Sequence, residues 1–93
     1  MRTIERSTAF KRDYRNAKSM PRYKELDSRL TRILELLVAD LPLTAAVRDH
    51  ALSGDWSGYR ECHVHPDLLL IYAKVAPSTL RLVRLGSHSD LFG

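Results

Sequence analysis

Three side chains that could carry out chemistry stand at every second position ahead of an apolar run. They are His63, His65 and Asp67, in the segment YRECHVHPDLLLIY. Alternate residues of a strand share one face, so the Cα atoms of the two histidines would lie about 7 Å apart. Such a pair, with Asp67 as a third ligand, could bind zinc or iron. It could equally serve metal-free catalysis, because imidazole has a pKa near ~6.5 and both accepts and donates protons at neutral pH.

The second half of the chain holds further titratable side chains, and we expect all four histidines at strand ends or turns, outside any helix. The set expected to converge on one rim of the fold is His50, His63, His65, His88, Asp49, Asp67 and Arg84. On a phosphodiester, one imidazole would take the proton of an RNA 2′-hydroxyl and another would return a proton to the leaving 5′-oxygen. Arg84 would offset the charge on the phosphate oxygens. The pattern alone does not choose between this chemistry and a metal site.

Charge is distributed unevenly along the chain. The net charge is +4, yet residues 1–32 hold ten Lys and Arg against four Asp and Glu, and residues 33–93 hold five against seven. The basic surface is therefore N-terminal, which is typical of a solvated helix face, of contact with nucleic acid, or of an acidic protein partner. The residues expected to contact RNA or the ribosome are Lys11, Arg12, Arg15, Lys18, Arg22 and Lys24.

Length and composition exclude several classes of protein. A chain of 93 residues with 44% hydrophobic and 28% charged residues predicts a single globular domain over 1–93. No apolar run approaches the ~20 residues of a membrane span, and MRTIERSTAF lacks the features of a signal peptide. Cys62 is the only cysteine, so no intrachain disulfide can form. We therefore expect a cytoplasmic protein that does not act on membranes.

Two helices are expected in the N-terminal half, after a short strand over 2–6. The first follows Ser7 as N-cap, and its apolar residues recur at helical spacing. The second has Pro21 in its first turn and ends at Pro42, with an apolar stripe over more than four turns. The apolar residues of the two helices are Phe10, Tyr14, Ala17, Tyr23, Leu26, Leu30, Ile33, Leu34 and Leu37.

Three strands follow, at about 59–65, 68–75 and 79–86, joined by the turns HPD and APS. Connections this short force antiparallel pairing. The predicted fold is α+β, with two N-terminal helices packed on one face of a small antiparallel sheet. Alternation places Cys62 and Val64 against the helices and His63 and His65 on the open face. In the next strand it favours Leu69, Ile71, Ala73 and Val75 on the covered face and Leu68, Leu70 and Tyr72 opposite.

Two segments resemble a known family. DHALSGDWSGYRECHVHPDLLLIY, from Asp49 to Tyr72, and LVRLGSHSDLF, from Leu82 to Phe92, are similar to the YafQ-type toxins, the mRNA-interferase branch of the RelE/ParE superfamily. The resemblance implies a RelE-like fold and ribosome-dependent cleavage of mRNA in the decoding site, with no metal and no cofactor. The products would be a cyclic or 3′-phosphate and a 5′-hydroxyl. The implied partners are a cognate antitoxin, the ribosome and mRNA, with operator DNA reached only through the antitoxin.

The resemblance also implies the site. Its residues fall on His50, His63, Asp67, Arg84, His88 and Phe92. His88 and His50 are expected to transfer protons, His63 and Asp67 to orient the RNA or share that work, and Arg84 to contact the scissile phosphate. Phe92 would stack on a base or pack on the sheet. His65 stands where an acidic residue is common and is expected to be non-catalytic, and Leu68 replaces an aromatic residue.

Two other functions compete with this one. A ParE-like gyrase inhibitor would share the fold and act by binding alone, but it has no need of four histidines at one rim. A metal-dependent hydrolase would use His63, His65 and Asp67 as ligands.

Overall fold

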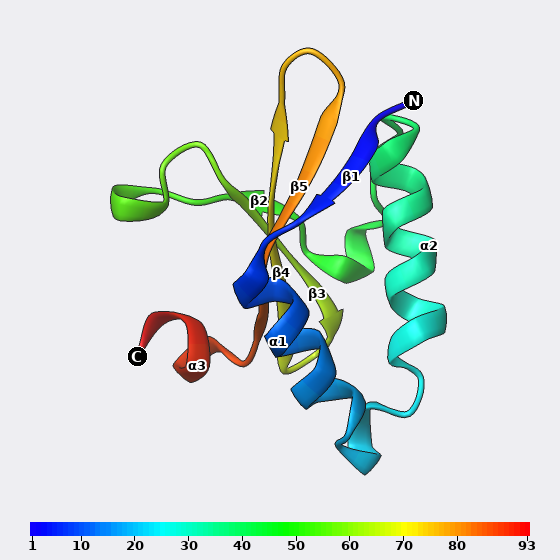
Figure 1. Ribbon diagram of the computed structural model, residues 1–93, viewed down its shortest axis with the longest axis vertical. Coiled ribbons are helices and arrows are strands. Elements are labelled where there is room, and N and C mark those ends of the chain that lie inside the picture. The colour runs from blue at the N-terminus through cyan, green and yellow to red at the C-terminus, as the bar shows by residue number, and fades with distance from the viewer.

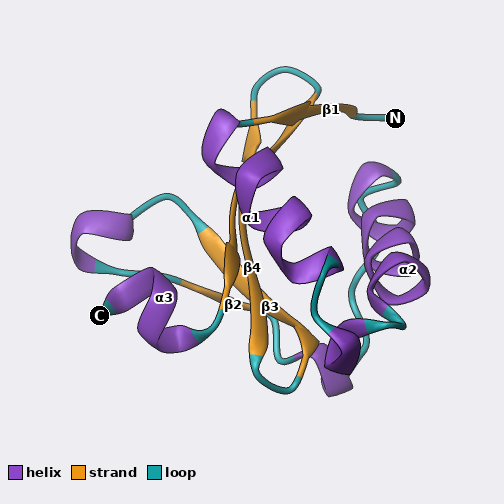
Figure 2. Ribbon diagram, turned by 60° about the horizontal axis from the view of Figure 1, so that its bottom comes forward, coloured by secondary structure: helices purple, strands orange, loops and turns teal.

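A five-stranded sheet carries helices on both of its faces. The computed structural model describes residues 1–93. In chain order the elements are β1 (Thr3–Arg6), α1 (Thr8–Lys18), the 3-10 turn η1 (Pro21–Tyr23), α2 (Leu26–Val38), η2 (Ala45–Val47), β2 (His50–Ala51), η3 (Gly54–Trp56), β3 (Arg60–His65), β4 (Leu68–Val75), β5 (Thr79–Gly86) and α3 (His88–Phe92). The strand order is β1-β5-β4-β3-β2, and all neighbours are antiparallel except β1 and β5. Figures 1 and 2 show α1 and α2 on one side of the sheet and α3 on the other. The predicted α+β fold is confirmed, with a parallel edge strand and a third helix added.

The first helix forms as the sequence predicts. The Ser7 side chain accepts a hydrogen bond from the Phe10 amide at 2.9 Å, which satisfies a free N–H of the first turn. Phe10 and Ala17 are buried on the face toward the sheet. The same face also buries Asp13, a carboxylate that periodicity does not single out.

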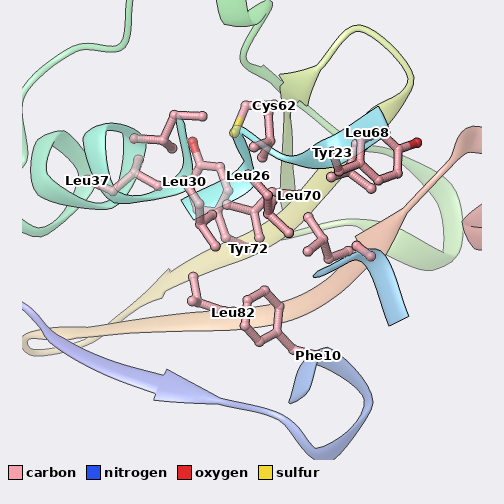
Figure 3. Packing of buried hydrophobic residues seen from close by; sticks show 14 of the residues in the cluster. Phe10, Tyr23, Leu26, Leu30, Leu37, Cys62, Leu68, Leu70, Tyr72 and Leu82 are labelled. Carbon is pink, nitrogen blue, oxygen red and sulfur yellow. The ribbon is translucent and has the colours of Figure 1, made fainter. Parts of the chain in front are cut away.

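The second helix starts later than expected. Pro21 opens the short turn η1, and α2 begins only at Leu26, because Glu25 at φ −96° and ψ 11° interrupts the helical backbone. The apolar stripe of α2 is nevertheless buried as predicted. Figure 3 shows these residues meeting β3, β4 and β5 in the main core, among them Leu26, Leu30 and Leu37 from α2 and Cys62, Leu70, Tyr72 and Leu82 from the strands.

The predicted faces of β4 are inverted. Leu68, Leu70 and Tyr72 pack beneath α1 and α2, whereas Leu69 and Ile71 face α3 and contact Leu91. Alternation failed here because α3 covers the second face of the sheet, so β4 is apolar on both sides from 68 to 73. No helix of the structure is long and apolar enough to cross a membrane.

Candidate active site

A buried carboxylate lies between two histidines at the edge of the sheet. The β2–β3 register pairs His50 with Glu61, and His63 lies two residues further along the same face of β3. Oε1 of Glu61 is 3.5 Å from Nε2 of His50 and 3.9 Å from Nε2 of His63. Only 5% of Glu61 is exposed. One carboxylate oxygen therefore faces both imidazoles, in a position where its charge is poorly screened.

Backbone carbonyls fix the orientation of both rings. Nδ1 of His50 lies 2.9 Å from the carbonyl oxygen of Arg48, and Nδ1 of His63 lies 3.1 Å from that of Pro66. A carbonyl oxygen only accepts, so the hydrogen of each neutral ring resides on Nδ1. Nε2 is then the lone-pair nitrogen, which is the atom that takes a proton in general-base catalysis. The fold thus presents two imidazoles with the basic nitrogen turned toward Glu61.

Helix α3 brings the third imidazole and an aromatic ring to this cluster. A shallow cavity of about 240 Å³ is lined by His50, Glu61 and Trp56 on one side and by His88 and Phe92 on the other. The rings of His88 and Phe92 are 5.0 Å apart, and Phe92 meets Trp56 edge to face at 6.2 Å. His88 is exposed and Phe92 is half-buried. The prediction that no histidine lies in a helix was wrong, because His88 is the first residue of α3.

A capping box holds α3 in place although the helix has only five residues. The Ser87 side chain accepts from the Asp90 amide at 3.1 Å, and the Asp90 side chain accepts from the Ser87 amide at 3.1 Å. Leu91 is buried against Leu69 and Ile71 of β4. These contacts give His88 and Phe92 a defined position over the sheet.

Arg84 lies in a neighbouring groove between α1 and α3, not in the histidine cavity. Its Nε donates to Oδ2 of Asp13 at 2.7 Å and its Nη2 approaches Oδ1 at 3.4 Å. The same Oδ2 accepts from the Leu85 amide at 3.0 Å. Hydrogen bonding to Asp13 raises the pKa of Arg84 above its ordinary value. Asp13 therefore holds Arg84 by one edge of the guanidinium and leaves Nη1 available to a ligand.

Asp67 lies in the turn between β3 and β4. It forms an exposed ion pair with Arg22 at 3.3 Å, and hydrogen bonding to Asp67 adds to burial in raising the pKa of Tyr23. These contacts tie Asp67 to η1 rather than to the histidines. The neighbouring Pro66 carbonyl, which orients His63, connects this turn to the cluster.

The predicted position of His65 was wrong. The register of β3 against β4 shifts between His63 and His65, and this irregularity turns His65 to the helix side, where its ring contacts Tyr23 at 5.1 Å. Its Nε2 is buried without a partner, and burial lowers its pKa. His63, His65 and Asp67 consequently do not converge as a ligand set, and no group of three His, Cys, Asp or Glu side chains in the chain is arranged to hold a metal.

The basic residues predicted to contact RNA are all exposed. Three of them have acidic neighbours: Lys18 with Asp27, Arg22 with Asp67 and Arg12 with Asp13. Lys11, Arg15 and Lys24 form no ion pair. Sequence reasoning missed two buried carboxylates of the site, Glu61 and Asp13. Glu61 shares the strand parity of His63, which was the available signal for it.

Known proteins resemble this chain over its whole length. The model of a family described as a bacterial toxin of type II toxin–antitoxin systems, YafQ, matches residues 2–93. The chain belongs to the YafQ family. It is 42% identical over 93 residues to the mRNA interferase toxin YafQ of Escherichia coli K12, in an alignment that covers 99% of this chain and 97% of that protein. The resemblance seen in the sequence is confirmed, and the E. coli relatives of this YafQ-family chain are mRNA interferases by name, which makes them endoribonucleases.

Two solved structures extend the comparison. The YafQ chain of the E. coli DinJ–YafQ complex is 40% identical, with a TM-score of 0.84 over 100% of both chains. A metal-bound toxin from Helicobacter pylori is 40% identical, with a TM-score of 0.82 over 99% of this chain and 100% of that one. With these TM-scores over the whole of each chain, the fold is shared.

Proposed function

We propose that this chain is a ribosome-dependent endoribonuclease toxin that cleaves mRNA in the decoding site by metal-free acid–base catalysis. The observation that carries the proposal is the cavity lined by His50, Glu61, His88 and Phe92, with His63 facing the same Glu61 carboxylate from the neighbouring groove. Such a site suits acid–base catalysis on RNA. One imidazole can take a proton from the 2′-hydroxyl while another gives a proton to the leaving 5′-oxygen.

The reaction proceeds in one displacement. Nε2 of His50, or of His63 beside it, removes the proton of the 2′-hydroxyl. The 2′-oxygen then forms a bond to phosphorus as the bond from phosphorus to the 5′-oxygen breaks. His88 in its protonated form gives a proton to that leaving oxygen. The products are a 2′,3′-cyclic phosphate and a 5′-hydroxyl, with one proton taken up and one released.

Two carboxylates support this step through other side chains. Glu61 stabilises the imidazolium that forms when His50 or His63 accepts the proton. Asp13 fixes Arg84 so that Nη1 reaches a phosphate oxygen from the neighbouring groove. Phe92, which contacts both His88 and Trp56, offers a ring on which a base adjacent to the scissile bond stacks. Asp67 holds the turn whose Pro66 carbonyl orients His63.

The partners of the reaction follow from the same proposal. The exposed basic residues of α1 and η1 contact ribosomal RNA, whose phosphates they would neutralise. A cognate antitoxin neutralises the toxin in the cytoplasm, as the E. coli complex with DinJ suggests by analogy, and operator DNA is reached only through that antitoxin.

The test is cleavage of mRNA on programmed ribosomes by the wild type, His50→Ala, His88→Ala and Glu61→Gln. Asp55→Asn is the matched control, because Asp55 is an exposed carboxylate that forms no ion pair. We expect new 5′-hydroxyl ends with the wild type and the control, and losses of roughly 10²-fold or more with the two histidine variants. Growth arrest without new ends would instead favour the ParE-like inhibitor.

A chelator arm tests the metal-free step, since the Helicobacter pylori relative is described as metal-bound. A transition-metal chelator that leaves ribosomal Mg²⁺ in place should not change the rate. Cleavage that the chelator abolishes and zinc restores would contradict the proposed mechanism.

A further inference from the structure

A second, larger groove opens beside the histidine cluster. It lies between α2 and η2, has a volume of about 640 Å³, and reaches the end of β3. Its cationic lining consists of Arg29, Arg32 and Arg48, and His63 and His65 line it as well. Of these residues, only His63 belongs to the catalytic cluster described above.

The groove carries an excess of positive charge. Arg29 pairs with Glu25 of the same helix at 3.2 Å, whereas Arg32 and Arg48 are exposed and form no ion pair. Glu25 is the only carboxylate among the lining residues. A guanidinium presents a planar fork of donors that matches two oxygens of a phosphate, so two free arginines across one groove favour a ligand with successive phosphates.

Part of the groove lining is apolar. Ile33 from α2, Val47 from η2 and Pro66 from the turn after β3 line the same groove. Phosphate contacts combined with apolar walls suit a single strand of nucleic acid, whose sugars and bases need a surface that water does not fill. A free phosphate or a small anion would use the arginines and leave these walls exposed.

Two residues connect the groove to the catalytic cluster. His63 lines the groove and also places Nε2 3.9 Å from Glu61. Arg48 contributes its side chain to the groove while its carbonyl oxygen orients His50 at 2.9 Å. Arg48 also holds the left-handed conformation, with φ 53° and ψ 45°, which is strained for a residue with a side chain and persists where surrounding structure imposes it.

The sheet leaves a path between the two sites. β2 pairs with β3 only at Glu61 and Arg60, so no strand covers the edge of β3 beyond Glu61. Figure 2 shows the short β2 beside β3, with α2 on the far side of the sheet from α3. A strand bound with its scissile phosphate at the cluster can therefore cross this edge at His63 and enter the groove.

We propose that the groove between α2 and η2 binds the phosphodiester backbone of the mRNA flanking the cleavage site, with Arg32 and Arg48 contacting successive phosphates. The inference rests on the proposed function, because it extends the substrate path of the same site. Ribosomal RNA has the same phosphate chemistry, and an acidic antitoxin segment would also be attracted to the groove, so the experiment separates these occupants from the mRNA strand.

The variants are Arg32→Glu and Arg48→Glu, with Arg32→Gln as a milder change. Arg6→Glu is the matched control, since Arg6 is an exposed arginine on β1, at the opposite edge of the sheet. Thermal melting checks that each variant folds. The first readout is fluorescence anisotropy of an mRNA-derived oligonucleotide that carries a 2′-deoxy residue at the cleavage position, titrated with the isolated protein at several salt concentrations.

We expect Arg32→Glu and Arg48→Glu each to weaken oligonucleotide binding about 10-fold. Each arginine that no longer neutralises a phosphate should also reduce the slope of log K against log salt by ~0.7, the value for a single strand. On programmed ribosomes Arg32→Glu should raise KM and leave the single-turnover rate at saturation within about twofold, because Arg32 lies outside the cluster. Arg48→Glu should also raise KM, but its rate is not used as a control because the Arg48 carbonyl orients His50. Arg6→Glu should match the wild type in both assays.

One result would overturn the inference, and two further measurements would then identify the occupant of the groove. Oligonucleotide binding equal to that of Arg6→Glu would show that the groove does not hold the mRNA strand. If the variants bind the oligonucleotide as the control does but bind vacant ribosomes more weakly, the groove holds ribosomal RNA. If they bind only the antitoxin more weakly, the groove holds the antitoxin. Failure of the wild type to cleave on programmed ribosomes would refute the proposed function instead, whatever the oligonucleotide data show.

Discussion

The buried carboxylate of Asp13 allows a specific prediction about stability. Its carboxylate is 8% exposed and accepts from Nε of Arg84 at 2.7 Å and from the Leu85 amide at 3.0 Å. Asp13→Ala would leave the buried Leu85 N–H without a partner, at a cost of about 1–3 kcal/mol. It would also leave Arg84, whose side chain is 26% exposed, without its carboxylate. Because Arg84 regains some water, this second loss lies well below the roughly 3–5 kcal/mol of a fully buried pair.

We therefore expect Asp13→Ala to lower the free energy of unfolding by about 2–4 kcal/mol, which corresponds to a fall in Tm of roughly 10–20 °C for a domain of this size. Asp13→Asn should cost about half as much, since its amide oxygen still accepts from Leu85. Denaturant unfolding is the assay, with Glu5→Ala as control for the exposed Glu5–Arg81 pair, which should cost ~1 kcal/mol or less. If Asp13→Ala is no more destabilising than Glu5→Ala, Asp13 does not anchor α1 to β5.

Three further predictions concern buried or capping groups. Burial, with Asp49 and Glu61 nearby, raises the pKa of Cys62 to about 12, so the native thiol should resist thiol reagents at about pH 8. The free energy of unfolding should fall between about pH 9 and 12, because the thiol ionises at lower pH in the unfolded chain than in the folded one. Burial lowers the pKa of His65, and the charge of Arg29 lowers it further, so the free energy of unfolding should decrease as the pH falls below ~6.5. The decrease should be smaller in His65→Leu, whose cleavage activity should change little. Equal stability of the wild type in denaturant titrations at about pH 7 and 5 would contradict this. Ser87→Ala should cost about 0.5–2 kcal/mol at the cap of α3 and reduce the single-turnover rate by displacing His88, while an unchanged rate would show that α3 is held without its cap.

The sequence predicted the helices because their apolar periodicity is unambiguous. Ser7 as N-cap and the stripe of α2 needed no tertiary information. The three main strands were also predictable, since the short turns allowed only antiparallel pairing. The faces of β4 could not be predicted, because a strand that is covered on both sides shows no alternation of apolar and polar residues. Helix α3 could not be predicted either, because it is too short to show a helical periodicity.

The candidate site was predictable in its residue types and less so in its geometry. His50, His88 and Phe92 line one cavity, and His63 faces Glu61 from the neighbouring groove, while the catalytic roles of these residues stay a prediction. His65 does not lie beside His63, because a one-residue irregularity in β3 turns its side chain to the opposite face of the sheet. No local sequence feature encodes that shift. The pairing of Asp13 with Arg84 spans 71 positions and depends on how α1 crosses the sheet, which only the folded chain determines.

Central to the proposed function is attack of the 2′-hydroxyl at the cleavage position on the adjacent phosphate, under acid–base catalysis by the histidine cluster. The most direct measurement is single-turnover cleavage on ribosomes programmed with two mRNAs that differ only by a 2′-deoxy residue at that position. We expect the deoxy message to bind and remain uncut there, while the ribose message yields a 2′,3′-cyclic phosphate and a 5′-hydroxyl end. Cleavage of both messages at the same bond would contradict this chemistry.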